Sequence, residues 1–79
     1  MHEIKIKIQD EYEVLSLRGI IYHGNNHFCS RIISADGTIW YNDGITTKNN
    51  GIEDGHLLTM NHEELITCNG KILVLAIYA

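Results

Sequence analysis

The chain begins with isoleucines that alternate with charged residues, in the segment EIKIKI at residues 3–8. A period of two places the isoleucines on one face of an extended segment and the lysines on the other, which is the pattern of a half-buried β-strand. Lysine side chains are also typical of an edge strand, where charge discourages pairing with a foreign strand. The sequence therefore predicts a strand at 3–8, lying at the edge of a sheet.

Four more segments have strand character, at 14–22, 27–34, 38–42 and 72–78. The chain contains no proline, and its β-branched residues crowd these periodic segments, which favours strands. Gly19 interrupts the first of them and is interpreted as a β-bulge. The last one, ILVLAIY, is apolar almost throughout. Such a run is typical of a central strand that is covered on both faces.

Two tight turns are predicted between these strands. The first has Gly24-Asn25 at its centre, which fits a two-residue type II′ hairpin loop. The second is either a three-residue loop, Ala35-Asp36-Gly37, with the glycine in the left-handed region, or a two-residue loop made of the Asp-Gly pair alone. The choice fixes which residues of the two flanking strands face each other.

The second half of the chain is less regular. The stretch 44–58 is rich in Gly, Asn, Asp and Thr and is interpreted as a long surface loop. Asn61 followed by Glu64 predicts a capping box at the start of a short helix. Gly70 is interpreted as its left-handed stop.

The order of elements predicts a single small α+β domain spanning 1–79. Its sheet is antiparallel with about five strands, and one short helix precedes the last strand. A chain of 79 residues buries only about 60–65% of the surface that its unfolded form exposes, so the core should be thin.

Charge and cysteine content exclude several classes. The net charge is −4 and the six basic residues are scattered, whereas nucleic acids and acidic membrane surfaces require clustered Lys and Arg. No apolar run approaches the roughly 20 residues of a membrane span. Two cysteines are too few for a disulfide scaffold. These features favour an intracellular protein, cytoplasmic or nuclear.

Three segments, YEVLSLRGIIYHGNNHF, GTIWYNDG and GKILVLAIYA, resemble in this order the C-terminal, histidine-box portion of the ubiquitin-specific protease family of papain-like thiol peptidases. The resemblance implies part of a papain-like palm. It implies that His27 takes the place of the catalytic histidine and that Asn42 or Asp43 takes the place of the residue that orients it. No cofactor is implied, and the implied partner is ubiquitin or a ubiquitin-like protein.

Spacing distinguishes the two orienting candidates. The three-residue loop would place Cys29 opposite Asp43, which then lies diagonal to His27 at about 7 Å between backbones, within reach of the two side chains. The two-residue loop would place Asn42 opposite Arg31, about 13 Å along the strand from the histidine. The first register favours Asp43.

The nucleophile is missing from the resemblance. The family carries it in an upstream Gly-Asn-x-Cys box that has no counterpart here. Cys29 follows His27 by two residues on one strand, which separates the two α-carbons by about 6.6 Å with nearly parallel side chains. A thiolate–imidazolium pair needs about 3 Å. We therefore expect a histidine-bearing fragment that is inactive alone or, as the alternative, a non-catalytic protein-binding domain that kept the sheet.

Binding candidates are aromatic. In the resembled family the region of Trp40 and Tyr41 borders the cleft that holds the ubiquitin tail, and Tyr22 is a third candidate. The other interpretation of the first two is a core aromatic and a rim aromatic on opposite faces of one strand. We also expect that exposed strand edges, with Lys5 and Lys7 or with the apolar segment 72–78, permit a homodimer.

A metal site is not expected. The possible ligands are His23, His27, Cys29 and Asp43. A turn separates the two histidines, so they do not share one face as a histidine pair at i and i+4 on a helix does.

Overall fold

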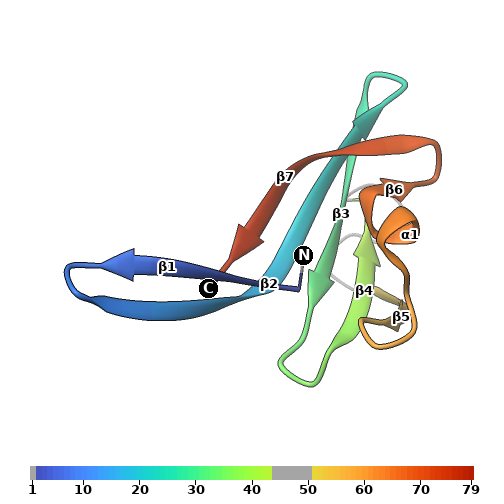
Figure 1. The fold of residues 1–79 in the computed structure, drawn as a ribbon. Coiled ribbons are helices and arrows are strands. Elements are labelled where there is room, and N and C mark those ends of the chain that lie inside the picture. Colours follow the sequence, from blue (N-terminus) through green and yellow to red (C-terminus); the bar gives the residue numbers. More distant parts are fainter. Residues whose placement is uncertain (1, 44–50) are drawn as a thin grey trace.

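The computed structural model of the chain describes residues 2–43 and 51–79. Seven strands and one short helix make up these residues (Figure 1): β1 (Glu3–Ile8), β2 (Glu11–Gly24), β3 (His27–Ile33), β4 (Thr38–Asn42), β5 (Ile52–His56), α1 (His62–Ile66), β6 (Thr67–Cys68) and β7 (Lys71–Tyr78). All strand pairs are antiparallel. The order across the sheet is β5-β4-β3-β2-β7-β6, and β1 pairs with β2 outside this path.

The sheet is curled into a half-barrel. Figure 1 shows β1 and the first half of β2 as an arm that projects from the body, while α1 and β6 lie beside the curled part. The arm makes the molecule elongated, with principal extents of 45 × 25 × 24 Å. The body therefore contains the core, and the arm is a two-stranded ribbon.

The predicted α+β class with about five strands is wrong, and so is its likeness to a papain-like palm. The structure is mostly β, with seven strands and a helix of five residues. Part of the error lies in 44–58, where 52–56 forms β5 rather than loop. This segment has no apolar period, and it becomes a strand because β4 offers it a free edge, with Trp40 opposite Glu53 and Tyr41 opposite Ile52. The rest of the predicted loop at 44–50 lies outside the described residues.

The helix begins as predicted and ends differently. The Asn61 side chain accepts a hydrogen bond from the Glu64 amide at 2.9 Å, and the Glu64 carboxylate accepts one from the Asn61 amide at 3.3 Å, so the capping box is confirmed. The predicted stop at Gly70 is wrong, because Thr67 already has extended geometry. Gly70 (φ 78°) and Asn69 (φ 51°) instead form the turn between β6 and β7. Asn-Gly suits a hairpin turn with two left-handed residues.

The turn between β3 and β4 confirms the three-residue loop. The Ser34 amide donates to the Thr38 carbonyl at 2.9 Å, Gly37 has φ 92°, and Ser30 faces Asn42. The turn between β2 and β3 lies one residue later than predicted. Its two loop residues, at 25 and 26, are both asparagines with φ of 53° and 58°, a combination that asparagine tolerates better than most residues. The predicted type II′ turn is therefore wrong.

The predicted strands are otherwise close to those observed. The first runs over 3–8 as expected, and β2 starts three residues before the predicted Val14 because β1 pairs with it back to Glu11. The register of β2 against β7 shifts between Leu17 and Gly19, which confirms the predicted bulge.

The core lies on the concave face of the sheet and under α1. The side chains buried there are Leu17, Ile20, Tyr22, Cys29, Ile33, Ile39, Leu65 and Cys68. Of the β7 residues, Leu73, Ala76 and Tyr78 pack against this cluster. Their alternation is interrupted by a second register shift, at which Leu75 faces Ile21 and Leu73 faces Tyr22. The prediction that β7 is covered on both faces is wrong. Its Ile72, Val74, Leu75 and Ile77 side chains are 65%, 56%, 51% and 45% exposed. No described element covers the outer, convex face of the sheet.

Candidate functional site

The candidate catalytic histidine lies at the start of β3. His27 is half-buried and faces Gly24 across the hairpin. Ser30 of β3 faces Asn42 of β4. If this register continued by one residue, Asp43 would lie opposite Cys29 and diagonal to the histidine. The strands are in the required register, but the catalytic roles of these residues stay predictions.

Neither cysteine is placed as a nucleophile. Cys29 and Cys68 are 3% and 5% exposed and belong to the core. Burial, only partly opposed by the nearby Arg31 cation, raises the pKa of the Cys68 thiol to about 11. A buried, protonated thiol is a poor nucleophile because the thiolate is the reactive form.

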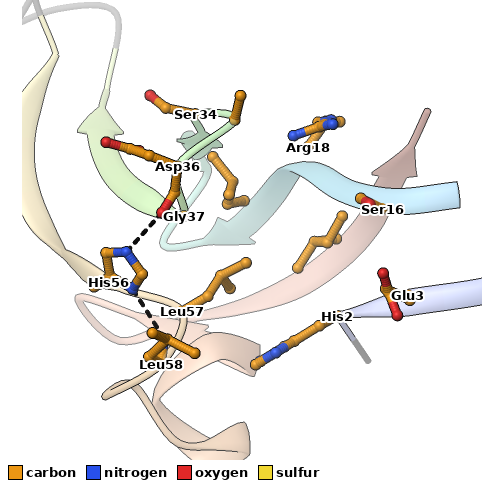
Figure 2. Close-up of a pocket in the computed structure, with 13 residues that line it drawn as sticks. His2, Glu3, Ser16, Arg18, Ser34, Asp36, Gly37, His56, Leu57 and Leu58 are labelled. Carbon is orange, nitrogen blue, oxygen red and sulfur yellow. Dashed lines mark hydrogen bonds between the residues drawn. The ribbon is translucent and has the colours of Figure 1, made fainter.

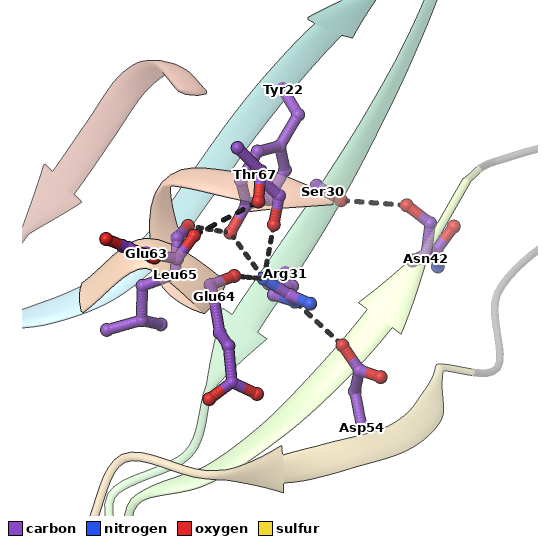
Figure 3. Close-up of polar contacts among 9 residues, drawn as sticks. All are labelled: Tyr22, Ser30, Arg31, Asn42, Asp54, Glu63, Glu64, Leu65 and Thr67. Atoms are coloured by element: carbon purple, nitrogen blue, oxygen red, sulfur yellow. Dashed lines mark hydrogen bonds and ion pairs between the residues drawn. The ribbon is translucent and has the colours of Figure 1, made fainter. Parts of the chain in front are cut away.

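A buried cation, Arg31, forms an extensive polar cluster (Figure 3). Arg31 is 8% exposed, and its Nε donates to Asp54 Oδ2 at 2.7 Å. Its Nη1 donates to the Glu64 carbonyl at 2.7 Å, to the Thr67 carbonyl at 3.1 Å and to the Tyr22 hydroxyl at 3.1 Å. These partners come from β5, α1, β6 and β2. One guanidinium therefore ties both ends of the curled sheet, and the helix, to its centre.

In this cluster Arg31 is ionised and Tyr22 is neutral. Burial raises the pKa of Tyr22, and the hydrogen bond from Arg31 only partly opposes it. Burial alone would lower the pKa of Arg31, but its bonds with Tyr22 and Asp54 outweigh that effect and the pKa is raised. At neutral pH a guanidinium cation thus faces a neutral phenol, whose hydroxyl donates to the Leu65 carbonyl at 2.6 Å.

The three aromatic binding candidates differ in position. Tyr22 is 0% exposed, so its ring has no surface with which to contact a partner. Trp40 lies on the outer face and its Nε1 donates to Ser34 Oγ at 2.8 Å. Tyr41 packs against the core cluster from the concave side, and burial raises its pKa. Trp40 and Tyr41 are half-buried and stay candidates.

Sequence reasoning missed Arg31 and Asp54. One signal was available: Arg31 alternates with Cys29 and Ile33 on the buried face of β3, and a charge at such a position needs a partner. The position of Asp54 could not be predicted from the sequence, because it depends on residues 52–56 forming the strand β5.

A cavity of about 380 Å³ lies where the start of β1 approaches the β3–β4 turn (Figure 2). His56 Nε2 is 2.7 Å from the Asp36 carbonyl, and Nδ1 accepts from the Leu58 amide at 3.1 Å. These two bonds set the tautomer with the proton on Nε2. A Cβ built on Gly37 would come within 2.6 Å of this ring. The imidazole ring is therefore held in place by its neighbours.

The charged lining of this cavity is mixed, with the guanidinium of Arg18 and the carboxylates of Glu3 and Asp36. Hydrogen bonds to Thr38 lower the pKa of Asp36. The lining therefore does not select for an anion or for a cation.

The second edge of β7 is an unusual surface. β7 pairs with β2 along one edge, but on the other it meets β6 only at Lys71 and Ile72. Among the described residues, no strand pairs with that second edge over 73–77. We call this stretch, Leu73 to Ile77, the open edge. Unpaired amides and carbonyls at such an edge are a template for another strand.

Two other exposed edges, those of β1 and β5, carry charge. β1 has Lys5 and Lys7, whose Nζ atoms lie 5.5 and 5.9 Å from the centre of the Tyr12 ring. β5 has Glu53 and Asp54. Charged side chains are a common means by which proteins protect sheet edges, and the open edge, with the sequence LVLAI, has none.

Metal sites, membrane spans and relatives give no further lead. Of the residues described, no three or more His, Cys, Asp or Glu side chains are grouped so that they could hold a metal ion. No helix in the same residues is long and apolar enough to cross a membrane. Comparisons with protein-family models, curated proteins and solved structures find no match to the chain.

Proposed function

We propose that this chain is a non-catalytic protein-binding domain that accepts a partner's β-strand at the open edge. The observation that carries the proposal is an unpaired strand edge with no charged residue, next to two edges that do carry charge. In recognition by strand addition, main-chain hydrogen bonds provide affinity and alternate side chains provide specificity.

The burial of both cysteines supports a binding role over a catalytic one. Acyl transfer by a thiol needs an accessible thiolate within hydrogen-bond reach of its base. Both Cys29 and Cys68 are buried in the core. Binding at the open edge requires no accessible thiol.

Alternation along β7 identifies the amide to measure. Ser16 and Ala79 exchange two main-chain hydrogen bonds, of 3.1 and 3.0 Å, so the Ala79 amide points toward β2. Because successive amides of a strand point to opposite edges, Ile77 also points toward β2 and Ala76 points toward the open edge.

The test is amide hydrogen exchange with a strand probe. The probe is a synthetic peptide with the sequence of residues 71–79 and added lysines at both ends for solubility. We expect the probe to slow exchange at Ala76 and to leave Ile77, already bonded to β2, nearly unchanged. Unchanged exchange at Ala76 with excess probe, or equal slowing at both amides, would contradict strand addition at this edge.

A second candidate is a histidine-bearing fragment of a ubiquitin-specific-protease-like thiol peptidase, with ubiquitin as partner. One observation supports it, namely the β3–β4 register, in which Ser30 faces Asn42; continued by one residue, this register would put Asp43 diagonal to His27. We expect the purified chain alone not to hydrolyse a fluorogenic ubiquitin substrate. Turnover that is lost in His27→Ala and kept in the exposed control His62→Ala would replace the binding proposal with this one.

A further inference from the structure

The proposed function leaves the partner open, and this inference rests on it. We infer that the strand accepted at the open edge is β7 of a second copy of the chain, paired antiparallel about a two-fold axis. The two curled sheets would then join into one continuous sheet across the β7 pair.

The lack of charged side chains makes the open edge better suited to self-association than the edges of β1 and β5. The chain has a net charge of −4, so contact between two copies is least disfavoured where the surfaces that meet carry no charge. A pair of β5 strands would oppose Glu53 and Asp54 to their own counterparts, and a pair of β1 strands would oppose lysines. Like charges directly across a strand pair are destabilising. The open edge opposes only Leu, Val, Ala and Ile.

Within the described part of the chain, the short β6 strand leaves most of this edge of β7 unpaired. β6 is two residues long and leaves β7 after Ile72, so it does not block the rest of the strand. A two-fold contact uses the same patch on both copies. Leu75 is the middle residue of the open edge and would therefore lie beside its own counterpart.

The apolar side chains of β7 provide the accompanying burial. Val74, Leu75 and Ile77 are 56%, 51% and 45% exposed in the single chain. An added antiparallel neighbour brings opposite Cβ atoms to about 4.5–5.5 Å, which partly covers side chains of this size. The edge is short, so we expect a dissociation constant on the order of micromolar rather than an obligate dimer.

Sedimentation across micromolar concentrations, on the order of the expected constant, tests the inference. We expect the full chain to shift from monomer to dimer, and Leu75→Lys to weaken dimerisation by about tenfold or more, because two lysines would then lie side by side. Ile32→Lys is the matched control. Ile32 is also 51% exposed on the outer face, but it belongs to β3, which is paired on both edges. Circular dichroism confirms that both variants fold.

Cross-linking gives a second, positional readout. Leu75→Cys with oxidised glutathione should give a disulfide-linked dimer, in which two thiols are oxidised and the glutathione disulfide is reduced to two thiols. Ile32→Cys should stay monomeric, since the two copies of residue 32 are separated by the intervening β2 and β7 strands.

The outcomes separate the two proposals. A monomer throughout, or a dimer equally stable in Leu75→Lys, overturns the inference. If the chain is monomeric but the strand probe still slows exchange at Ala76, the open edge accepts an added strand but not a second copy of the whole chain, and the proposed function stands. If neither occurs, both proposals fail.

Discussion

Replacing Arg31 with methionine tests which contacts hold the half-barrel closed. The guanidinium is 8% exposed and donates to two main-chain carbonyls, of Glu64 and Thr67, as well as to Asp54 and Tyr22. Methionine has a similar length and fills much of the same space, but it donates no hydrogen bond. The substitution therefore removes the donors without leaving a large cavity.

The expected cost follows from the exposure of each partner. Each part-buried carbonyl that loses a charged donor costs about 1.5–3 kcal/mol. The Asp54 side chain is 35% exposed and can rehydrate, so its loss adds less than about 1 kcal/mol. The apolar methionine offsets about 1 kcal/mol. We expect Arg31→Met to lower the free energy of unfolding by about 3–5 kcal/mol, against a total of about 4–12 kcal/mol for a domain of this size.

Urea denaturation provides the assay, followed by the fluorescence of Trp40, the only tryptophan of the chain, and by far-ultraviolet circular dichroism. The matched variant is Asp54→Asn, which keeps the carbonyl contacts and should cost only about 0.5–1 kcal/mol. If Asp54→Asn costs as much as Arg31→Met, the ion pair, not the anchoring of α1 and β6, is the main contribution, and this reasoning is refuted.

Three further measurements test local features. Gly37→Ala and Gly70→Ala both place a side chain at positive φ, 92° and 78°, which should lower the free energy of unfolding by about 1–2 kcal/mol each. Only the side chain at position 37 would also meet the imidazole ring of His56, so Gly37→Ala should cost at least about 1 kcal/mol more in thermal or urea unfolding. Equal costs would argue against that contact. Cys29 and Cys68 should resist a thiol reagent at pH 8 in the native protein and react in denaturant, since both are buried and the pKa of the second is raised to about 11; rapid native labelling would contradict their burial. Asn61→Ala removes the helix cap and should cost about 1 kcal/mol, whereas no loss in urea unfolding would mean that tertiary contacts alone hold α1.

Local patterns predicted the elements that depend on neighbouring residues. The alternation at 3–8, the capping box at Asn61 and the left-handed Gly37 were all found in the structure. The loop length at Gly37 also set the β3–β4 register. Each of these features is decided within a few residues of the chain, where backbone geometry and side-chain type act directly.

Elements that require a distant edge could not be predicted in this way. The segment 52–56 has no strand pattern of its own and is a strand because it lies along β4. Gly70 serves a hairpin rather than a helix stop because 67–68 pairs with the start of β7. The α+β prediction failed at these two places, where tertiary pairing overrode weak local preference.

The sequence alone determined that this chain makes antiparallel strands with tight turns, one capped helix and an uncharged final strand. The tertiary structure decided that the final strand, β7, lies with one edge open and one face exposed, and that Arg31 is buried at the centre of the curl. The physical reason is that burial and edge pairing depend on which segments meet in space. A run such as LVLAI is equally compatible with a covered central strand and with a strand that has one unpaired edge.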